Sequence, residues 1–233
     1  MNLKDKKSAS LRDVFSKSLP MRYRKGEVIL RADTIPSGVY FIEKGFVKVY
    51  SITQDGDEKL HIIYKEGELF PLIWLFLDLS KEVFYEALSG VVLRRLTRKD
   101  FFKLTWQNSN ILHEIIERII VTLSVHVDRI DNLELSHAYS RVIARLIFLA
   151  KRFGVRHGKE LIIQAPLTQK DIAASINMTR ETVARELRNL ELRKLIKYTD
   201  HLIAIPNMNK LKSELDIHYA RNLYKQIFGL FVF

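Results

Sequence analysis

Residues Leu167–Ile196, LTQKDIAASINMTRETVARELRNLELRKLI, decide the fold of this 233-residue chain, because they predict two short helices joined by a tight turn. Thr168 is suited to cap the first helix, with Asp171 at the spacing of a capping box. Asn177-Met178 supplies the turn, and Thr179 is suited to cap the second helix. Two helices joined in this way are the frame of a helix-turn-helix domain.

The second predicted helix separates an apolar face from a charged one. Its apolar residues recur at steps of four and three, which is the spacing of one helix face: Val183, Leu187 and Leu190. Charged residues occupy the opposite face and the first turn: Arg180, Glu181, Arg185 and Arg188. A helix that buries one side and presents such charges at its N-terminal end fits a DNA major groove.

The residue types on the charged face suit base recognition. Arg bonds guanine O6 and N7 bidentately, and Glu accepts a hydrogen bond from cytosine N4. We therefore expect DNA base contacts from Arg180, Glu181 and Arg185. Expected phosphate contacts come from the helix N-termini and their flanks: Thr168, Gln169, Thr179, Thr182 and Arg188. The alternative is an exposed amphipathic helix whose Glu181–Arg185 pair only adds solubility, which leaves the two caps unexplained.

The segment Thr179–Arg185, TRETVAR, resembles the recognition helix of the catabolite-activator branch of the Crp–Fnr family of transcription regulators. The resemblance extends over Tyr23–Asn207. It implies that Arg180, Glu181 and Arg185 read the bases of a half-site similar to TGTGA, repeated as an inverted palindrome. It also implies an N-terminal jelly roll similar to a cyclic-nucleotide-binding domain, followed by a long dimerisation helix.

Charge and composition agree with a nucleic-acid partner. The formal net charge is +11, and residues 139–200 hold 13 Lys and Arg against 6 Asp and Glu, whereas residues 1–138 hold 21 against 19. A basic C-terminal part beside a nearly neutral N-terminal part predicts a polyanion partner for the former. The absence of cysteine excludes disulfides, thiolate-bound clusters and cysteine-based zinc sites, including the oxygen-sensing cluster of the fumarate–nitrate branch. No apolar run is long enough to span a membrane, and residues 1–10, MNLKDKKSAS, lack the apolar region of a signal peptide, so we expect a cytoplasmic protein.

The N-terminal third shows short strand-like runs separated by glycines, the pattern of a sandwich or barrel. The expected strands are Val28–Leu30, Val39–Ile42, Phe46–Ile52, Leu60–Tyr64, Leu69–Leu77, Val83–Leu88 and Val91–Leu96.

The resemblance also identifies where a cyclic nucleotide would bind, and this chain departs from the pattern there. Pro71-Leu72 occupies the place of the Gly-Glu pair that holds the ribose, and Glu82-Val83 lies near the place of the phosphate-binding Arg-Ser pair. No Arg lies between Leu60 and Leu93. Because burying a phosphate without a cation is costly, we expect no control by cyclic AMP.

The same stretch is rich in apolar and aromatic residues. One interpretation is a pocket for an apolar or aromatic effector of unknown identity, lined by Phe70, Trp74, Phe76, Phe84 and Tyr85. The other is a filled core that binds nothing, which is the commoner role of an aromatic cluster.

Residues 108–135 predict a long helix with a packed seam, which in the resembled family is the dimer axis. The seam residues recur at steps of three and four: Leu112, Ile116, Ile119, Leu123, Val127 and Ile130. Ile111, Ile115 and Ile120 broaden this face, so that one side can cover the jelly roll and the other a second copy. His61, His113 and His126 are ordinary packed or solvated residues in the plainer interpretation, and haem ligands or pH switches in the other.

The C-terminal part predicts a further helix over Tyr139–Phe153, a basic loop at Arg156–Lys159, a strand at Leu161–Ile163, and a hairpin of Leu195–Tyr198 with Leu202–Ile205. These strands make the motif a winged helix. Beyond Asn207, a last helix is expected through Leu211, Leu215, His218, Leu223 and Ile227, before the apolar end Phe228–Phe233.

The resulting prediction is an α+β protein: a jelly roll over residues 1–107, a dimerisation helix and hinge over 108–137, and a winged helix-turn-helix domain with an extension over 138–233. Its predicted function is sequence-specific transcription regulation as a homodimer on double-stranded DNA, with RNA polymerase as a possible partner. The alternative is a small-molecule sensor whose winged helix contacts a protein. Because no phosphate loop, nucleophile setting or metal-ligand spacing is found, we expect no enzyme, catalytic residue, metal or cofactor.

Overall fold

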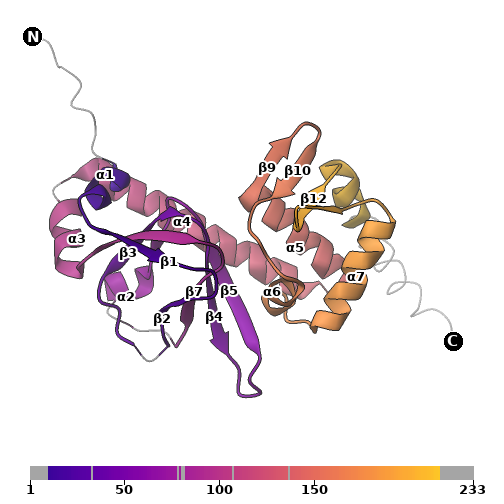
Figure 1. Ribbon diagram of the computed structural model, residues 1–233, viewed down its shortest axis with the longest axis horizontal. Helices are drawn as coiled ribbons and strands as arrows, with labels where there is room; N and C mark the ends of the chain where they lie inside the picture. The colour runs from indigo at the N-terminus through magenta and orange to yellow at the C-terminus, as the bar shows by residue number, and fades with distance from the viewer. Residues whose placement is uncertain are drawn as a thin grey trace, which may run out of the picture. The chain divides into compact units, whose positions relative to one another are not determined.

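The computed structural model describes residues 10–32, 34–77, 79, 82–106, 108–135 and 137–215. The chain divides into two compact units, Met1–His126 and Val127–Phe233, and the division falls inside one long helix (Figure 1). Each unit is described by itself below.

The N-terminal unit contains two four-stranded antiparallel sheets. One sheet has the order β1 (Pro20–Tyr23), β8 (Val91–Leu96), β3 (Val39–Lys44) and β6 (Leu69–Phe70). The other has the order β2 (Val28–Leu30), β7 (Phe84–Ala87), β4 (Val47–Ile52) and β5 (Glu58–Tyr64). Side chains of both sheets are buried between them, which confirms the predicted jelly roll.

The predicted strand Leu69–Leu77 is wrong. Only Leu69–Phe70 pairs as a strand, and after Pro71 the chain turns into helix α2 (Leu72–Leu77), where the amide of Leu75 donates to the Pro71 carbonyl at 3.1 Å. Pro71 has no N–H with which to continue a sheet ladder. A continuous apolar run does not by itself distinguish a buried strand from a buried helix, which is why the pattern misled.

Three elements of the N-terminal unit were not predicted: α1 (Leu11–Ser16), β1 and α3 (Arg98–Thr105). Ser10 and Asp13 form a capping box at the start of α1, and Leu11 and Phe15 are fully buried. Around them lies a core cluster from the sheet β1–β8–β3–β6 and three further helices: Val39, Phe41, Leu69, Leu75, Phe101, Ile111 and Ile115. Helix α1 was not predicted because most of residues 2–18 are polar, so that Leu11 and Phe15 did not stand out as core residues.

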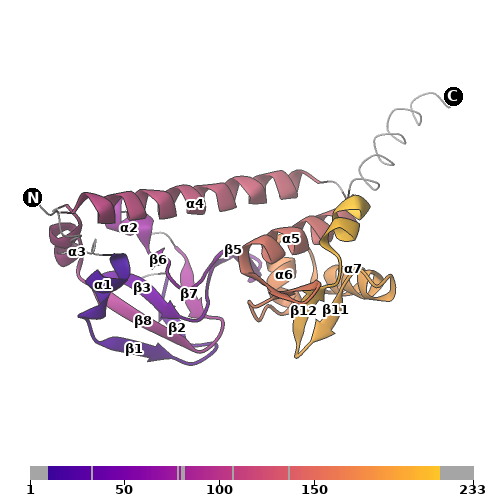
Figure 2. The ribbon, with the colours of Figure 1, turned by 90° about the horizontal axis from the view of Figure 1, so that it is seen from above.

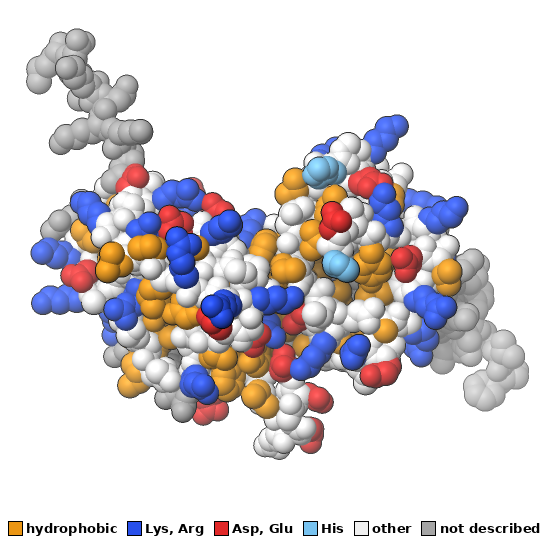
Figure 3. All heavy atoms as spheres, viewed as in Figure 1, with side chains coloured by type: hydrophobic (Ala, Val, Ile, Leu, Met, Phe, Trp, Pro, Cys, Tyr) orange, Lys and Arg blue, Asp and Glu red, His pale blue; other side chains and the backbone are white. Residues whose placement is uncertain are grey.

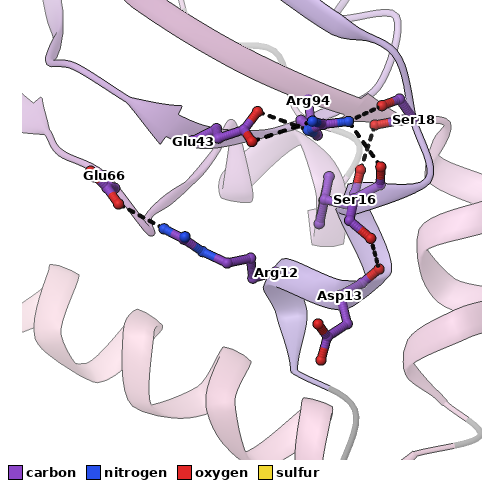
Figure 4. Close-up of polar contacts among 8 residues, drawn as sticks. Arg12, Asp13, Ser16, Ser18, Glu43, Glu66 and Arg94 are labelled. Atoms are coloured by element: carbon purple, nitrogen blue, oxygen red, sulfur yellow. Dashed lines mark hydrogen bonds and ion pairs between the residues drawn. The ribbon is translucent and has the colours of Figure 1, made fainter.

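Arg94 of β8 fastens α1 to the sheet (Figure 4). Its Nε donates to Glu43 Oε2 at 2.8 Å, and its Nη1 donates to the Ser16 carbonyl at 2.9 Å and also to the Ser18 carbonyl. The hydrogen bond from Arg94 holds the pKa of the Glu43 carboxyl below its ordinary value. One guanidinium thus satisfies carbonyls at the end of a helix that lies far from it in sequence.

Helix α4 (Ser109–Glu134) confirms the predicted long helix (Figure 2). Ile111 and Ile115 are buried in the N-terminal unit at 2% and 1% exposure. Glu114 accepts a hydrogen bond from the amide of Leu11 at 2.8 Å, and Arg118 donates to the Gly67 carbonyl. One face of α4 therefore covers the jelly roll, as expected.

The C-terminal unit holds α5 (Ala138–Phe153), α6 (Gln169–Ser175), α7 (Arg180–Leu192) and a sheet. The sheet has the order β11 (Lys197–Thr199), β12 (Leu202–Ile205), β10 (Glu160–Ile163) and β9 (Gly154–His157). The predicted helix 139–153 and the hairpin after α7 are confirmed. The predicted loop Arg156–Lys159 is wrong, because Arg156 and His157 belong to β9 and pair with Leu161 and Glu160.

A further helical stretch begins at residue 208 and is described to residue 215. It contains Leu211, which is fully buried, and Leu215. The rest of the predicted last helix, with His218, Leu223 and Ile227, and the apolar end Phe228–Phe233 lie outside the described residues.

Candidate functional site

The pair of helices α6 and α7 is held by the caps that the sequence predicted. The Thr168 hydroxyl accepts from the Asp171 amide at 3.1 Å, and Asp171 Oδ2 accepts from the Thr168 amide at 2.9 Å. Thr179 caps α7 by accepting from the amide of Thr182. Asn177 adopts φ +52° in the turn, a conformation that Asn tolerates better than most residues. The turn thereby sets the start of α7 relative to α6.

Helix α7 has the two faces that its periodicity predicted. Val183, Leu187 and Leu190 are at most 1% exposed, and the helix packs on α5 and α6. The charged residues of the other face are exposed: Arg180, Glu181, Arg185 and Arg188. Lys and Arg side chains are spread over the visible side of the C-terminal unit, among Asp, Glu, His and apolar side chains (Figure 3). The exposed face of α7 offers guanidinium and carboxylate groups that the core does not use.

Arg185 has a different partner from the one that helical spacing suggested. Its Nε lies 3.3 Å from Glu186 Oε1, and Glu186 is largely buried, with 14% of its side chain exposed. The expected pair with Glu181 is replaced by this contact between neighbours. Glu186 anchors one side of a guanidinium that is itself 72% exposed.

The expected phosphate contacts differ in how far their side chains are already engaged. The hydroxyls of Thr179 and Thr182 lie 2.9 Å apart at the exposed start of α7. Thr168 donates to Asp171 within its capping box. Gln169 bonds the hydroxyl of Tyr198 in β11, and burial, the largest cause, raises the pKa of that tyrosine. Sequence reasoning missed Tyr198, because this contact joins residues 29 positions apart in the wing and α6.

A polar cluster at the other end of α7 was also not predicted. Arg193, which caps the C-terminus of α7, bonds the hydroxyl of Tyr139 and pairs with Glu214 at 2.7 Å. Tyr139 lies in the first turn of α5, and its hydroxyl donates to Glu214 at 3.2 Å. Burial and the Glu214 carboxylate raise the pKa of Tyr139 to about 12. The cluster ties the helical stretch from residue 208 to α5 and α7.

The N-terminal unit contains a cavity of about 250 Å³ between the sheet β2–β7–β4–β5, α2 and α4. Its walls are mainly apolar and aromatic, with one arginine and two histidines: Leu30, Arg31, Thr34, Pro36, Val49, His61, Ile62, Tyr64, Pro71, Ile73, Trp74, Leu79, Val83, Tyr85 and His126.

Two of the five expected pocket residues, Trp74 and Tyr85, line this cavity. Phe70 does not, because it is fully buried among the rings of Tyr40, Tyr64 and Tyr85, with ring centroids 5.0–5.8 Å apart.

Phe76 and Phe84 also lie outside the cavity lining. Phe76 packs edge-on against Phe102 of α3, and Phe84 stacks on Tyr50. A filled aromatic core and a cavity therefore lie side by side in this unit, and the binding of an effector stays a prediction.

Pro71 and Val83, from the two places where the resembled family holds ribose and phosphate, both line the cavity. A cation is nevertheless present, because Arg31 lines the cavity from the end of β2. Arg31 lies outside Leu60–Leu93, the stretch in which the sequence contains no arginine. His126, which comes from α4, and His61 are placed in the same wall, whereas His113 is exposed on α4.

Two family models match the chain, a cyclic nucleotide-binding domain over residues 20–108 and a Crp-like helix-turn-helix domain over residues 140–214. The first covers the jelly roll and the second covers α5, α6, α7 and the wing.

The chain belongs to the Crp–Fnr family. Curated relatives of this Crp–Fnr regulator include the fumarate and nitrate reduction regulatory protein of Yersinia pestis, 23% identical over 81% of this chain and 75% of the relative. The cAMP-activated global transcriptional regulator CRP of Salmonella typhimurium is 26% identical over 68% of this chain and 75% of its own length. Both relatives are transcription regulators, and neither is named as an enzyme.

Solved structures of the family share the fold. A CooA mutant from Carboxydothermus hydrogenoformans covers 87% of this chain and 89% of its own, with a TM-score of 0.72 and 18% identity. FixK2 from Bradyrhizobium japonicum covers 84% of this chain and 96% of its own, with a TM-score of 0.71 and 22% identity. In the part of the chain that the structure describes, no helix is long and apolar enough to cross a membrane.

Proposed function

We propose that this Crp–Fnr regulator binds DNA sequence-specifically as a homodimer, on an inverted repeat of TGTGA-like half-sites, and without control by cyclic AMP. The observation that carries the proposal is the exposed face of α7, where Arg180, Glu181 and Arg185 stand opposite a fully buried face. A rigid helix with this arrangement can enter the major groove while its other side stays packed.

The three side chains divide the reading of bases among them. Arg180 and Arg185 can each donate two hydrogen bonds to a guanine, and Glu181 can accept one from a cytosine amino group. Glu186 restrains Arg185 at 3.3 Å, which reduces the number of conformations that the guanidinium loses on binding.

Phosphate contacts would set the register of α7 on the duplex. Thr179 and Thr182 stand at the N-terminus of α7, where backbone amides and the helix dipole favour an anion. Arg188, one turn further along, is exposed and cationic. Because such contacts release counterions, we expect affinity to fall steeply as salt concentration rises.

The test is a fluorescence-anisotropy titration of the full chain onto a duplex with a TGTGA-like inverted repeat and onto a scrambled duplex, at near-physiological salt. Arg180→Ala should weaken binding to the repeat by about 1–3 kcal/mol and relax the preference at one base position. The matched control is Arg188→Ala, which should weaken binding to both duplexes alike. Uniform loss in the Arg180 variant would reassign that residue to phosphate.

The same titration with and without cyclic AMP tests nucleotide control. Pro71 and Val83 line the cavity at the places of the family's ribose and phosphate ligands, and their side chains offer no hydrogen bond to either group, so we expect the nucleotide to leave the affinity unchanged. Selective binding that appears only with cyclic AMP would contradict this part of the proposal while leaving DNA recognition intact. Binding without any selectivity would contradict the TGTGA-like half-site, and an affinity that does not fall with salt would favour the alternative of a protein partner.

The dimer is supported by the apolar face of α4. Seven apolar residues of one side of this helix are 37–61% exposed: Leu112, Ile116, Ile119, Ile120, Leu123, Val127 and Ile130. Exposed apolar rows at this spacing are typical of helix–helix interfaces. A two-fold dimer also matches an inverted repeat, because each copy reads one half-site.

Replacing Ile116 and Leu123 together by Glu should convert the dimer into a monomer in light scattering coupled to size exclusion, because two carboxylates would be buried in the seam. Val121→Glu is the matched control, since Val121 is 49% exposed and helical spacing puts it on the far side of α4. A double variant that stays dimeric would contradict the assignment of the seam.

A further inference from the structure

The cavity of the N-terminal unit has a chemical character that the family's nucleotide chemistry does not account for. Its walls combine a large aromatic and aliphatic surface with nitrogen-bearing side chains: Arg31, His61 and His126. No carboxylate lies among the residues that the structure describes in its lining. An apolar cavity with a few polar groups of one kind selects a ligand by shape and by the charge at one end.

The aromatic walls are held in place from behind. Phe70 stacks on Tyr64 and Tyr85 at ring-centroid distances of 5.8 and 5.0 Å, so the outer surfaces of these two rings face the cavity as a supported wall. Trp74 of α2, which also lines the cavity, has the Arg98 guanidinium at 5.8 Å from its ring, and Arg98 bonds the Leu75 carbonyl at 2.8 Å. Walls that are already ordered lose little entropy when a flat ring enters.

Tyr85 brings a hydroxyl to this wall. No hydrogen-bond partner for that hydroxyl is found among the described residues, and burial raises the pKa of Tyr85 well above its ordinary value. The phenol is therefore a neutral donor at all physiological pH values. A hydroxyl donor without a partner in a cavity wall favours a ligand with an acceptor oxygen.

Size limits the occupant further. At about 250 Å³ the cavity is smaller than most ligand pockets, which run to roughly 300–1000 Å³. It suits a single aromatic ring with a short acidic side chain better than a nucleotide. The guanidinium of Arg31 then favours a carboxylate on that ring over a neutral group.

We infer that this cavity binds a small aromatic carboxylate, with the ring between Trp74 and Tyr85 and the carboxylate within reach of Arg31. The inference rests on the proposed function, for which it supplies the class of effector. His126 belongs to α4, the helix with the exposed apolar seam, so an occupant of the cavity contacts the element that pairs the two copies.

The test uses the full chain with Trp106→Phe, which leaves Trp74 as the single tryptophan because the chain has two. Trp74 fluorescence is followed while benzoate, phenylacetate or phenylpropionate is added, and each acid is compared with its neutral amide. At least one acid should bind about 10–100 times more tightly than its amide, the range for a charge-assisted hydrogen bond.

Arg31→Gln should abolish the preference for acid over amide and leave the affinity for the amide unchanged. Arg24→Gln is the matched control, because Arg24 is exposed in the same unit and does not line the cavity. Tyr85→Phe should weaken acid and amide binding together. The inference is overturned if acids and amides bind equally, if cyclic AMP binds more tightly than every acid, or if no acid changes Trp74 fluorescence at millimolar concentration.

DNA binding is measured by anisotropy on the same preparations in the absence of any acid. If selective DNA binding is retained while no acid binds, the inference about the cavity fails and the proposed function stands. If neither is observed, the proposed function fails as well.

Discussion

The sequence predicted residues 167–196 and residues 69–88 very unequally. In the first segment the two caps, the turn and both faces of α7 lie as expected. In the second, an expected strand contains the helix α2, and three of five expected pocket residues lie elsewhere. The difference lies in the range of the interactions that determine each segment.

In the helix-turn-helix segment the decisive contacts join residues three or four positions apart. Thr168 with Asp171 and Thr179 with Thr182 are examples, and their partners can be read from spacing alone. In the cavity segment the decisive contacts are long-range. Phe70 stacks on Tyr40, which is 30 positions away, and Phe76 packs against Phe102, which is 26 positions away.

The largest expected effect tests the buried face of the well-predicted region. Leu187→Ala should lower the free energy of unfolding by about 2–5 kcal/mol, because it empties a fully packed site in the C-terminal unit. The measurement is urea unfolding followed by circular dichroism. Leu192→Ala is the matched control, since Leu192 is 75% exposed on the same helix. Equal effects of the two variants would contradict the division of α7 into two faces.

The next effect tests a long-range contact that the sequence did not reveal. Arg94→Ala should lower the free energy of unfolding by about 1–3 kcal/mol, because the Ser16 and Ser18 carbonyls and Glu43 lose a charged donor. Amide hydrogen exchange should speed up in Leu11–Ser16. Arg95→Ala, the neighbour on β8 with a single bond to Ser37, should have the smaller effect. Unchanged exchange in α1 would show that Arg94 does not fasten it.

The smallest effect concerns the polar cluster at the end of α7. Because the pKa of Tyr139 is raised to about 12, the folded state keeps the proton where the unfolded chain loses it, near pH 10. Stability from this group is therefore complete below about pH 10 and declines as the pH rises toward 12. Tyr139→Phe should flatten this alkaline decline in pH-dependent thermal unfolding.

Glu214→Gln is the companion variant, since Glu214 is the second cause of the shift after burial. It should flatten the alkaline decline partly, because burial of the Tyr139 ring remains. If the curves of unfolding temperature against pH of both variants run parallel to the curve of the parent protein, Tyr139 does not contribute to the alkaline decline.

The family and the α+β architecture could be predicted because they depend on patterns repeated along the chain. Short strands between glycines, the seam of α4 and the TRETVAR segment each extend over several residues, so an error of one position leaves the conclusion unchanged. The elements α1, β1 and α3 were missed because each is short and depends on distant parts of the chain: α1 and α3 pack into the core cluster, and β1 pairs with β8.

The candidate sites follow the same rule. The exposed residues of α7 could be named because helical spacing alone separates them from Val183 and Leu187. Arg31 and His126 could not be assigned to the cavity, because Arg31 follows β2, His126 belongs to α4, and the two lie 95 residues apart. Their meeting depends on how the sheet and the long helix pack, which no local pattern encodes.

The sequence by itself determined the helix-turn-helix, its caps and its charged face, since hydrogen bonds and periodicity within a few residues are enough to specify them. Only the tertiary structure decided which aromatic residues fill the core and which line the cavity. It also decided that an arginine outside the nucleotide-binding stretch lines that cavity. The physical reason is that burial is a property of the whole packed unit, and a ring becomes core or wall according to the distant side chains that cover it.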